Sequence, residues 1–396
     1  MLTDKTVVLG VTGGIAAYKA ADLASKLTQG GAIVNVIMTG SAMEFVAPLT
    51  FRAITHRPVV TSMFELNSEF SVEHIALAEA ADIVVIAPAT ANIIAKIATG
   101  IADDMLTTTV LATKAPVVVA PAMNVNMWQN PVTQENVLRL KERGFTFVGP
   151  GYGRLASGSM GLGRFVDISE IMGTVQQVLG RKGDLAGKGI VVTAGGTREA
   201  IDPVRYIGNR SSGKMGFALA EAARDRGATV TLITAPVSLP VPAGMEVINV
   251  ESVVEMNEAV AKATTKADAL IMAAAPADYV AKSVADQKIK KGSAALTVDL
   301  VKAPDIISEV SGDFIKVGFS AETENLLDNA RGKLERKRLD LMVANDVTAA
   351  DSGFGVDTNK VTIIDREGKT EDLPLMTKRE VADRVLDRVV GLLTSG

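Results

Sequence analysis

Two glycine pairs in this sequence stand where a backbone can approach a phosphate closely. Gly13-Gly14 follows the apolar run KTVVLGV and leads into a helical pattern, and Gly195-Gly196 follows the similar run KGIVVTA. The free N–H groups at a helix start bind anions, and glycine lets the backbone come near them. Glycine is equally useful for turning the corner between a strand and a helix. Both interpretations therefore stay open for these pairs.

The residues that end the second strand of each half narrow the choice of ligand. A dinucleotide site usually carries Asp or Glu there, which hydrogen bonds to the ribose hydroxyls. Thr39–Ser41 stand at this place in the first half and Thr234–Pro236 in the second. The usual NAD signature is missing, and hydroxyl groups at this edge favour a phosphate or a mononucleotide such as FMN.

The chain has only two histidines. His74 lies in SVEHIALAEAAD, where Ser71 is placed to cap a helix whose first turn includes the histidine. The helix dipole disfavours a cation there, so the imidazole stays neutral and available as a base. A surface histidine without chemistry is the alternative. His56 lies beside Arg57 in a loop, where a solvated side chain is expected.

The run PAMNVNMW (121–128) contains the only tryptophan and follows a buried strand. Ligands bind in the crevice at the carboxyl ends of parallel strands, so its asparagines are candidates for substrate contacts. A turn with an apolar plug is the alternative interpretation.

A polar block at 197–214 separates the second glycine pair from its helix and has no counterpart in the first half. It contains DPVRYIGNRSSGKMG, whose arginines before a helix start suit a phosphate. Loops of this length are usually functional in a compact unit. Gly213-Lys214 is not expected to form a P-loop, because Met215 stands where that motif has a hydroxyl residue. The run KIKK (288–291) is a candidate functional segment because it follows Asp278, which stands at the end of a strand. A solvated charged surface is the alternative interpretation.

The elements that must position these residues alternate between strand and helix. Apolar runs at 5–11, 82–88 and 115–121 predict buried strands, and 15–28 has helical spacing. The whole pattern returns after a Gly- and charge-rich stretch at about 180–189. We therefore expect an α/β protein made of two doubly wound, Rossmann-like parallel-sheet domains in tandem. The expected domains are 1–178 and 189–396, with a linker at 179–188.

Composition excludes several classes of function. The 396 residues include no cysteine, which rules out disulfides, thiolate metal sites and a cysteine nucleophile. The net charge of −4, with both signs interspersed, favours neither nucleic acid nor an anionic membrane. The start MLTDKTVVLGVTGG lacks the features of a signal peptide, and no apolar run is long enough to span a bilayer. A cytoplasmic protein is expected.

The first half resembles the flavin-dependent phosphopantothenoylcysteine decarboxylases through TGGIAAYK, SAMEFV, His74, APATAN and PAMNVNMW. The resemblance covers residues 1–175 and implies that FMN is bound, with His74 as the catalytic base and Asn124 holding the substrate carboxylate. Oxidation of the carbon that bears the thiol creates an electron sink for decarboxylation, which is the chemistry that a flavin supplies. The resemblance implies an FMN site made of Gly13, Gly14, Ser41, Pro88, Ala89, Thr90, Asn92, Thr107, Thr108 and Met123.

One residue departs from that family. Many members have a cysteine in a substrate flap, where it donates a proton in the last step, whereas Ser157 stands in the matching run LASGSMGLGR. The much higher pKa of a hydroxyl makes serine a poor acid. The final proton then comes from water or Tyr152, or the step is slow.

The second half, over residues 187–396, resembles phosphopantothenate–cysteine ligase of the CTP-dependent type through DPVRYIGNRSSGKMG, AAAPADY, KIKK, GFSAET and LERKRLDLMVAND. The resemblance implies that the phosphopantothenate carboxylate attacks the α-phosphate of CTP to give an acyl-cytidylate and pyrophosphate. Cysteine then displaces CMP from the acyl-cytidylate. Asn209 would hold that intermediate, Arg205 would assist, and Lys288 would neutralise phosphate charge. Mg²⁺ (or Mn²⁺) would bridge the phosphates. The implied CTP site consists of Gly195, Gly196, Ser211, Ser212, Gly213, Asp278, Lys288, Phe319, Lys337 and Asn345.

Both resemblances in one chain match the bifunctional enzymes of coenzyme A biosynthesis, in which the ligase product is the decarboxylase substrate. The implied partners are 4′-phosphopantothenate, cysteine and CTP. The resemblance also implies a homo-oligomer, with a trimeric first domain, a dimeric second domain and a dodecamer overall. The alternatives are a tandem NAD(P) oxidoreductase, which need not retain a flavin, and a flavin-binding protein without activity, which would release no CO₂.

Overall fold

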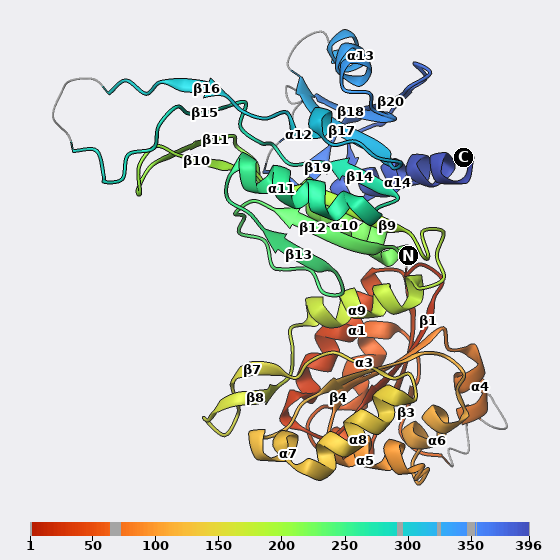
Figure 1. The fold of residues 1–396 in the computed structure, drawn as a ribbon. Coiled ribbons are helices and arrows are strands. Elements are labelled where there is room, and N and C mark those ends of the chain that lie inside the picture. Colours follow the sequence, from red (N-terminus) through yellow and green to blue (C-terminus); the bar gives the residue numbers. More distant parts are fainter. Residues whose placement is uncertain are drawn as a thin grey trace. The chain divides into compact units, whose positions relative to one another are not determined.

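The computed structural model describes residues 2–63, 73–290, 296–322, 326–346, 353 and 355–395. The chain divides into two compact units, Met1–Leu179 and Gly180–Gly396, which are considered separately below (Figure 1). None of the helices in the described part of the chain has the length and hydrophobicity that a membrane crossing requires.

The first unit is built on a six-stranded sheet in the order β3-β2-β1-β4-β5-β6, and all neighbouring strands pair in parallel. These strands are β1 (Thr6–Val11), β2 (Ile33–Met38), β3 (Val59–Val60), β4 (Ile83–Ala89), β5 (Val117–Pro121) and β6 (Thr146–Phe147). Every residue of β4 is buried, as expected for a central strand covered on both faces. The strand order is that of a doubly wound dinucleotide-binding fold, whose order reverses between β1 and β4.

Helices cover both faces of this sheet and bury a separate apolar core on each. One face is covered by α1 (Lys19–Gln29), α3 (Pro48–Thr55) and α9 (Ile168–Gly180). The other is covered by α4 (Glu73–Ala80), α5 (Ala91–Thr99), α6 (Met105–Ala112) and α8 (Pro131–Glu142). Three short helices, η1 (Ile15–Tyr18), α2 (Gly40–Met43) and α7 (Val125–Gln129), lie between strands and longer helices, and β7 (Gly151–Arg154) pairs with β8 (Met160–Arg164) as a hairpin.

The second unit repeats the same topology and extends it. Its sheet has the order β13-β12-β9-β14-β17-β18-β20-β21, in which the first six strands are parallel and the last two are antiparallel additions. These strands are β9 (Gly189–Ala194), β12 (Thr229–Thr234), β13 (Glu246–Asn249), β14 (Ala269–Met272), β17 (Ile315–Glu322), β18 (Leu341–Asp346), β20 (Val361–Asp365) and β21 (Thr370–Asp372). Two tandem doubly wound units confirm the fold class expected from the sequence.

The helices of the second unit also divide between two faces. One core lies under α10 (Lys214–Asp225) and α14 (Lys378–Ser395). The opposite core lies under α11 (Val253–Ala263), α12 (Ile306–Glu309) and α13 (Leu326–Arg336). The remaining elements are η2 (Thr264–Lys266) and the paired short strands β19 (Thr358–Asn359) and β22 (Met376–Thr377).

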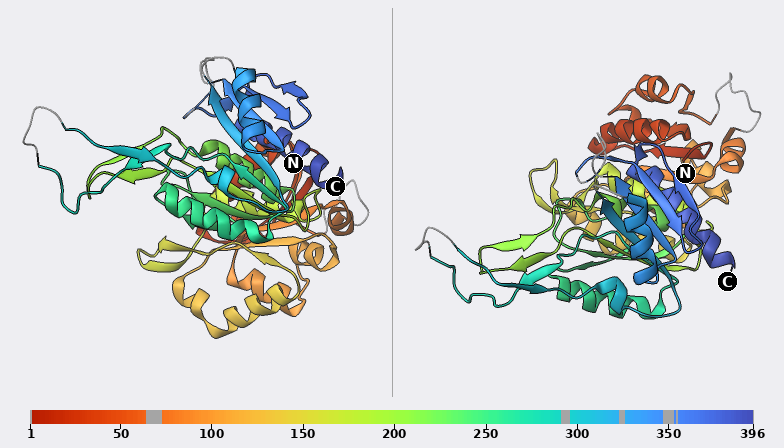
Figure 2. Two further views of the ribbon diagram at one scale, coloured as in Figure 1. Left: turned by 45° about the horizontal axis from the view of Figure 1, so that its top comes forward. Right: turned by 90° about the horizontal axis from the view of Figure 1, so that it is seen from above.

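The polar block at 197–214 forms a hairpin of β10 (Arg198–Ala200) and β11 (Tyr206–Gly208). A second hairpin, of β15 (Tyr279–Ala281) and β16 (Leu300–Lys302), lies beside it. Together they extend from the sheet of the second unit as an arm, which is seen from two further directions in Figure 2. The insertion therefore has regular structure of its own.

Most of the stretch predicted to be a linker is folded onto the second unit. Leu185 is fully buried in the core under α10, and its N–H donates to the carbonyl of Arg226. The guanidinium of Arg226 in turn pairs with Asp184. A segment rich in glycine and charge is held here by an apolar side chain and by two ion pairs, that of Asp184 with Arg226 and that of Lys188 with Asp268.

Buried charges connect α10 to α14. Asp225, the last residue of α10, is 1% exposed and accepts from the guanidinium of Arg224 at 2.6 and 2.8 Å. Its second oxygen accepts from Arg379 of α14 at 2.8 Å. Removal of the carboxylate would leave Arg224, which is 3% exposed, as a buried charge without its anion.

We expect Asp225→Ala to lower the free energy of unfolding of the second unit by about 3–5 kcal/mol, because buried ion pairs are costly to break from one side. The measurement is the urea midpoint of the second unit at an unchanged denaturant slope. Asp313→Ala is the matched control, since Asp313 is exposed, and it should change stability by less than about 0.5 kcal/mol. A midpoint equal to that of the control would contradict the role of Asp225.

Candidate functional site

The carboxyl ends of β1, β2 and β4 meet at one edge of the first unit. Gly13 packs so closely on the loop after β2 that a Cβ atom at this position would lie 2.3 Å from the Cβ of Ser41. Only glycine fits there, and its close approach brings the two loops together. Gly14 then opens η1, which takes the first turn of the helix expected from residue 15 as a 3₁₀ turn. This edge is where doubly wound folds bind nucleotides.

The hydroxyl of Thr12 ties this edge together and was not singled out by its sequence pattern. Thr12 is 1% exposed, its Oγ1 donates to the carbonyl of Pro88 at 2.7 Å, and it accepts from the N–H of Thr90 at 3.1 Å. The loop after β4 is thereby fixed against the end of β1. Pro88 and Ala89 are buried, and Asn92 is exposed at the start of α5. A threonine that directly precedes the glycine pair is the one signal in the sequence.

Thr39, at the end of β2, has a hydroxyl that fits a bound ligand. Its Oγ1 is buried and has no hydrogen-bond partner among the described residues. Buried hydroxyls normally find partners, so this orphaned group requires a ligand atom or a water molecule. Its place beside Gly13 and Ser41 suits the phosphate or ribityl hydroxyls of a flavin mononucleotide. The residues present therefore fit that cofactor.

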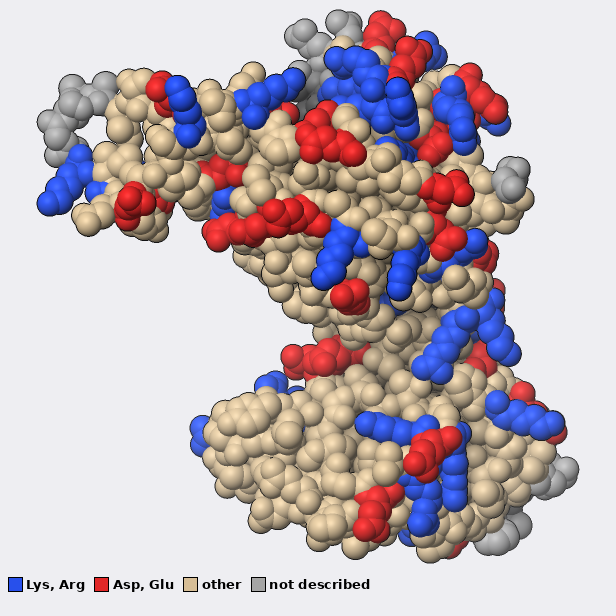
Figure 3. All heavy atoms as spheres, in the orientation of Figure 1, with Lys and Arg blue, Asp and Glu red and all other residues tan. Residues whose placement is uncertain are grey.

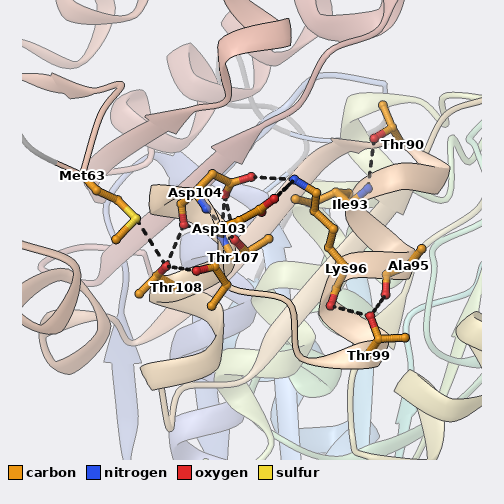
Figure 4. Close-up of polar contacts among 11 residues, drawn as sticks. Met63, Thr90, Ile93, Ala95, Lys96, Thr99, Asp103, Asp104, Thr107 and Thr108 are labelled. Atoms are coloured by element: carbon orange, nitrogen blue, oxygen red, sulfur yellow. Dashed lines mark hydrogen bonds and ion pairs between the residues drawn. The ribbon is translucent and has the colours of Figure 1, made fainter.

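The hydroxyls of Thr107 and Thr108 take part in the start of α6. Asp104 caps that helix, and the Thr107 hydroxyl completes the capping box from a position that is 2% exposed. The Thr108 hydroxyl donates to the carbonyl of Asp104 at 2.8 Å and lies 3.6 Å from the sulfur of Met63 (Figure 4). Both hydroxyls therefore hold the loop in place, and any contact with a ligand adds to that role.

An ion pair holds the same loop from α5. The ammonium of Lys96 lies 2.7 Å from Asp103 and 3.6 Å from Asp104, as Figure 4 shows. The hydrogen bond to Asp103 outweighs partial burial and raises the pKa of Lys96, so its charge is retained at neutral pH. Thr90 caps α5 by accepting from the N–H of Ile93. The loops before α5 and α6 are thus pre-organised.

The run PAMNVNMW begins at the end of β5 and supports a hairpin. The N–H of Met123 donates to the carbonyl of Gly163 in β8 at 3.0 Å. A side chain on Gly163, whose φ is +141°, would clash with the carbonyl of Met123 at 2.2 Å. Asn124 is exposed and caps α7 by accepting from the N–H of Asn126 at 2.9 Å. The hairpin is therefore fixed relative to Asn124.

Ser157 lies at the exposed tip of this hairpin, between β7 and β8. Its Oγ lies 2.8 Å from the Oγ of Ser159. Tyr152, the other expected proton source, is 68% exposed on β7 of the same hairpin. The hydroxyl groups of Ser157 and Tyr152 are thus both exposed on the hairpin of β7 and β8.

His74 lies in the first turn of α4 and is half-buried, as expected from its sequence context. Its helix packs against α6, where the hydroxyl of Thr113 donates to the carbonyl of Ala78 at 3.0 Å. The expected cap, Ser71, lies outside the described residues. His56 is exposed and ends α3 in the left-handed conformation, with φ +56°. A left-handed helix-ending residue explains His56 without any chemistry.

The second unit has a cavity of about 860 Å³ at the carboxyl ends of β14, β17 and β18. Its volume is within the range of small-molecule sites. It brings together eight of the residues implied by the ligase resemblance, namely Asn209, Ser211, Ser212, Gly213, Asp278, Phe319, Lys337 and Asn345. They come from five separate segments of the chain. The amide nitrogen of Asn209 donates to the carbonyl of Pro276 at 2.8 Å, which joins two of those segments.

Four other implied residues lie outside the lining of this cavity. Gly195 and Gly196 support its wall, because a Cβ on Gly196 would lie 2.4 Å from the carbonyl of Asn209. Arg205 lies beside β11, where it pairs with the buried Asp202 at 3.1 Å and donates to the carbonyl of Ile289. The exposed Lys288 precedes Ile289, whose N–H also donates to Asp202. Their roles stay predictions.

Several cavity residues escaped sequence reasoning. Lys333 precedes Lys337 by one turn of α13, so helical spacing is the signal that places both on one face. Asp305 pairs with Lys337 at 3.0 Å. Burial acts to raise the pKa of Asp305, but hydrogen bonds from Lys337 and Ser308 outweigh it and lower that pKa. The Oγ of Ser320 lines the cavity, is buried and has no partner among the described residues.

The electrostatics of this cavity favour an anionic ligand. Figure 3 shows Lys and Arg side chains gathered over the region of α13. Within the described residues, no three His, Cys, Asp or Glu side chains come together as metal ligands.

Comparisons with known proteins agree with the division into two units. The family model described as Flavoprotein matches residues 1–180, and that of the DNA/pantothenate metabolism flavoprotein C-terminal domain matches residues 185–393. The coenzyme A biosynthesis bifunctional protein CoaBC of Bacillus subtilis is 47% identical over 99% of this chain and 98% of its own length. The protein of that name from Escherichia coli K12 is 43% identical over 98% of this chain and 97% of its own.

Solved structures align with one half of the chain each. The C-terminal domain of coenzyme A biosynthesis bifunctional protein CoaBC aligns over 54% of this chain and 99% of its own, with 38% identity and a TM-score of 0.47. A PPC decarboxylase mutant complexed with pantothenoylaminoethenethiol aligns over 44% of this chain and 97% of its own, with 36% identity and a TM-score of 0.39.

We expect Thr12→Val to lower the stability of the first unit by about 1–3 kcal/mol, because the Pro88 carbonyl and the Thr90 N–H lose their common partner. Retained flavin, measured by visible absorbance per protein, should fall as well. Thr28→Val is the control, since that hydroxyl bonds only within α1, to the carbonyl of Ala24. Equal melting temperatures and flavin contents for the two variants would refute the role of Thr12.

Proposed function

The chain belongs to the CoaBC family of bifunctional proteins of coenzyme A biosynthesis, and we propose how each of its two units catalyses its reaction. The protein is an enzyme with a flavin-dependent decarboxylase in the first unit and a ligase in the second. The relatives match it over nearly the whole of both chains, and the two family models fall on the two units. The first unit binds FMN.

In the ligase unit, we propose that the carboxylate of 4′-phosphopantothenate attacks the α-phosphate of CTP, which gives an acyl-cytidylate and releases pyrophosphate. Cysteine then displaces CMP from the acyl-cytidylate. The observation that carries this is the cavity of the second unit, which combines an amide, lysines and an orphaned hydroxyl. Asn209 would hold the acyl-cytidylate while cysteine attacks. Lys337 would offset phosphate charge, with Arg205 and Lys288 assisting from the arm. Mg²⁺ would bridge the phosphates and keep most of its waters.

In the decarboxylase unit, we propose that His74 takes the proton of the substrate thiol and that Asn124 holds the carboxylate. Bound FMN supplies the two-electron oxidation that makes loss of CO₂ possible. Asn124 is suited to its role because its Oδ1 is engaged in capping α7, which orients the amide group. The hairpin of β7 and β8, fixed to Met123, would cover the bound substrate and present Ser157 and Tyr152 to it.

Mass spectrometry of the products tests the proposal directly. With 4′-phosphopantothenate, cysteine, CTP and Mg²⁺, the wild-type protein should form 4′-phosphopantetheine. His74→Asn should stop at phosphopantothenoylcysteine, with turnover reduced about 10²- to 10⁴-fold, because the base is lost while the ligase unit is unchanged. Asn209→Ala should abolish formation of that intermediate yet still decarboxylate it when it is supplied.

The arrest point of the wild-type reaction also reports on Ser157. A product lighter than phosphopantetheine by two hydrogens would place the block at the final proton transfer, and Ser157→Cys should then relieve it. Absence of any new product would reject the proposed function and favour a protein that binds flavin without catalysis or a different oxidoreductase.

We propose that the enzyme is a homo-oligomer, with a trimeric first unit, a dimeric second unit and a dodecamer overall. Apolar side chains beside the flavin edge support self-association of the first unit, because Leu49 is 71% and Ile15 is 60% exposed. The arm of the second unit exposes Tyr206, Val204 and Tyr279 in the same way.

Analytical ultracentrifugation should give a mass about twelve times the 41.4 kDa of the chain. Leu49→Glu places a charge in the proposed trimer contact, so it should reduce the assembly to dimers of about twice the chain mass. Leu138→Glu, at an exposed site on α8, is the matched control and should leave the dodecamer intact. A stable wild-type monomer would exclude the assembly.

A further inference from the structure

Two lysines that begin separate helices meet at one end of the ligase cavity. Lys214 is the first residue of α10, and Lys378 is the first residue of α14. Both line the cavity, together with Gly353 and Asn359. The dipoles of both helices favour an anion at these ends, and the N–H of Lys378 already donates to the carbonyl of Asp357 at 2.9 Å. None of the roles proposed above uses either lysine.

A single loop currently satisfies both ammonium groups. Lys214 Nζ donates to Asp357 Oδ1 and to the carbonyl of Gly355, both at 2.7 Å. Lys378 is 6% exposed, and its Nζ donates to the carbonyls of Gly353, at 3.0 Å, and Val356. Among the described residues, Asp357 is the one carboxylate that the ammonium groups of this pair contact. The carboxylate of Asp357 contacts Lys214 directly and acts on the ammonium group of Lys378 through its charge alone.

Neighbouring charges contribute to the shifts in the pKa values of Asp357 and Lys378, as expected from their proximity. The hydrogen bond from Lys214 lowers the pKa of Asp357, and the charge of Lys378 adds to that effect. Burial lowers the pKa of Lys378, with a further contribution from the neighbouring charge of Lys214. An additional anion at this place would therefore interact favourably with both ammonium groups.

The contact of Lys214 with Asp357 is easily exchanged. The side chain of Asp357 is 86% exposed, and that of Lys214 is 31% exposed. Exposed ion pairs contribute little to stability, whereas hydrogen bonds from an ammonium to phosphate oxygens inside a pocket are considerably stronger. A phosphate entering the cavity would displace the carboxylate without breaking any part of the core.

We propose that Lys214 and Lys378 form a phosphate-binding subsite of the ligase cavity, in which Asp357 takes the place of a phosphate until the ligand arrives. The inference rests on the proposed ligase function and deepens it. The ligase must hold two phosphorylated reactants, CTP and 4′-phosphopantothenate, and the cavity is also lined by Lys333 of α13 and by Lys337, which follows that helix. The shared chemistry is a terminal phosphate group, from either the triphosphate or the phosphomonoester.

Calorimetric titration of the full-length protein tests the subsite, with CTP, CMP, 4′-phosphopantothenate and pantothenate titrated separately. Lys214→Met should weaken binding of the ligand whose phosphate occupies the subsite by about 10- to 100-fold, because a charge-assisted hydrogen bond is lost. Asp357→Asn should strengthen binding of the same ligand by about 2- to 5-fold, because the competing carboxylate is removed. CMP and pantothenate, which lack the terminal phosphate in question, should respond to neither variant.

The two sources of phosphate give different results. An effect on CTP but not on CMP assigns the subsite to the triphosphate, and an effect on 4′-phosphopantothenate but not on pantothenate assigns it to the phosphomonoester. Lys262→Met, on the exposed face of α11, and Asp313→Asn, before β17, are the controls for a change in net charge. Melting temperatures confirm that each variant is folded.

Three outcomes would overturn all or part of the inference. If neither Lys214→Met nor Asp357→Asn shifts any dissociation constant beyond its charge-matched control, the subsite does not exist while the ligase proposal stands. If the wild-type protein binds neither CTP nor 4′-phosphopantothenate, the proposed ligase function fails and the subsite fails with it. Weaker binding by Asp357→Asn would show that Asp357 contacts the ligand rather than replacing it.

Discussion

Parallel strands that are buried on both faces constrain everything else in this protein. Such strands need helical crossovers, and the crossovers place every strand-to-helix loop at the same edge of the sheet. In the first unit this edge gathers Gly13, Ser41 and the loop after β4 from segments that are far apart in the sequence. In the second unit the residues that line the cavity lie at the same edge. One topology used twice has thereby produced two ligand sites of different chemistry.

The loops at these edges are held by polar groups that the protein itself satisfies. Thr12 joins β1 to the loop after β4, and Asp104 with Thr107 fixes the start of α6. Asp202 does the same for the arm, through the N–H groups of Val204 and Ile289. A site whose loops are already ordered loses less entropy when a ligand binds. Among the described residues, the buried hydroxyls of Thr39 and Ser320 have no protein partner and are available to a ligand.

The two sites differ in how they carry charge. The first is made chiefly of backbone, glycines and hydroxyls, and the ion pair of Lys96 with Asp103 holds its frame. Two of the lysines that line the second are paired with carboxylates, Lys337 with Asp305 and Lys214 with Asp357. Under the ligase function proposed above, such internal counter-ions would keep these two cations paired before a charged reactant binds.

The sequence by itself determined the local features, since these depend on neighbouring residues. The repeated strand-and-helix pattern predicted two doubly wound units, and the context of His74 placed it in a first helical turn. The family motifs identified both chemistries. Only the tertiary structure could show that Gly13 touches Ser41, that Leu185 anchors the expected linker, and that Lys288 lies outside the cavity lining. The proximity of Lys214 and Lys378 could also be seen only in the tertiary structure. Contacts between distant segments depend on how the sheet places its loops, and no periodic pattern in the sequence reports them.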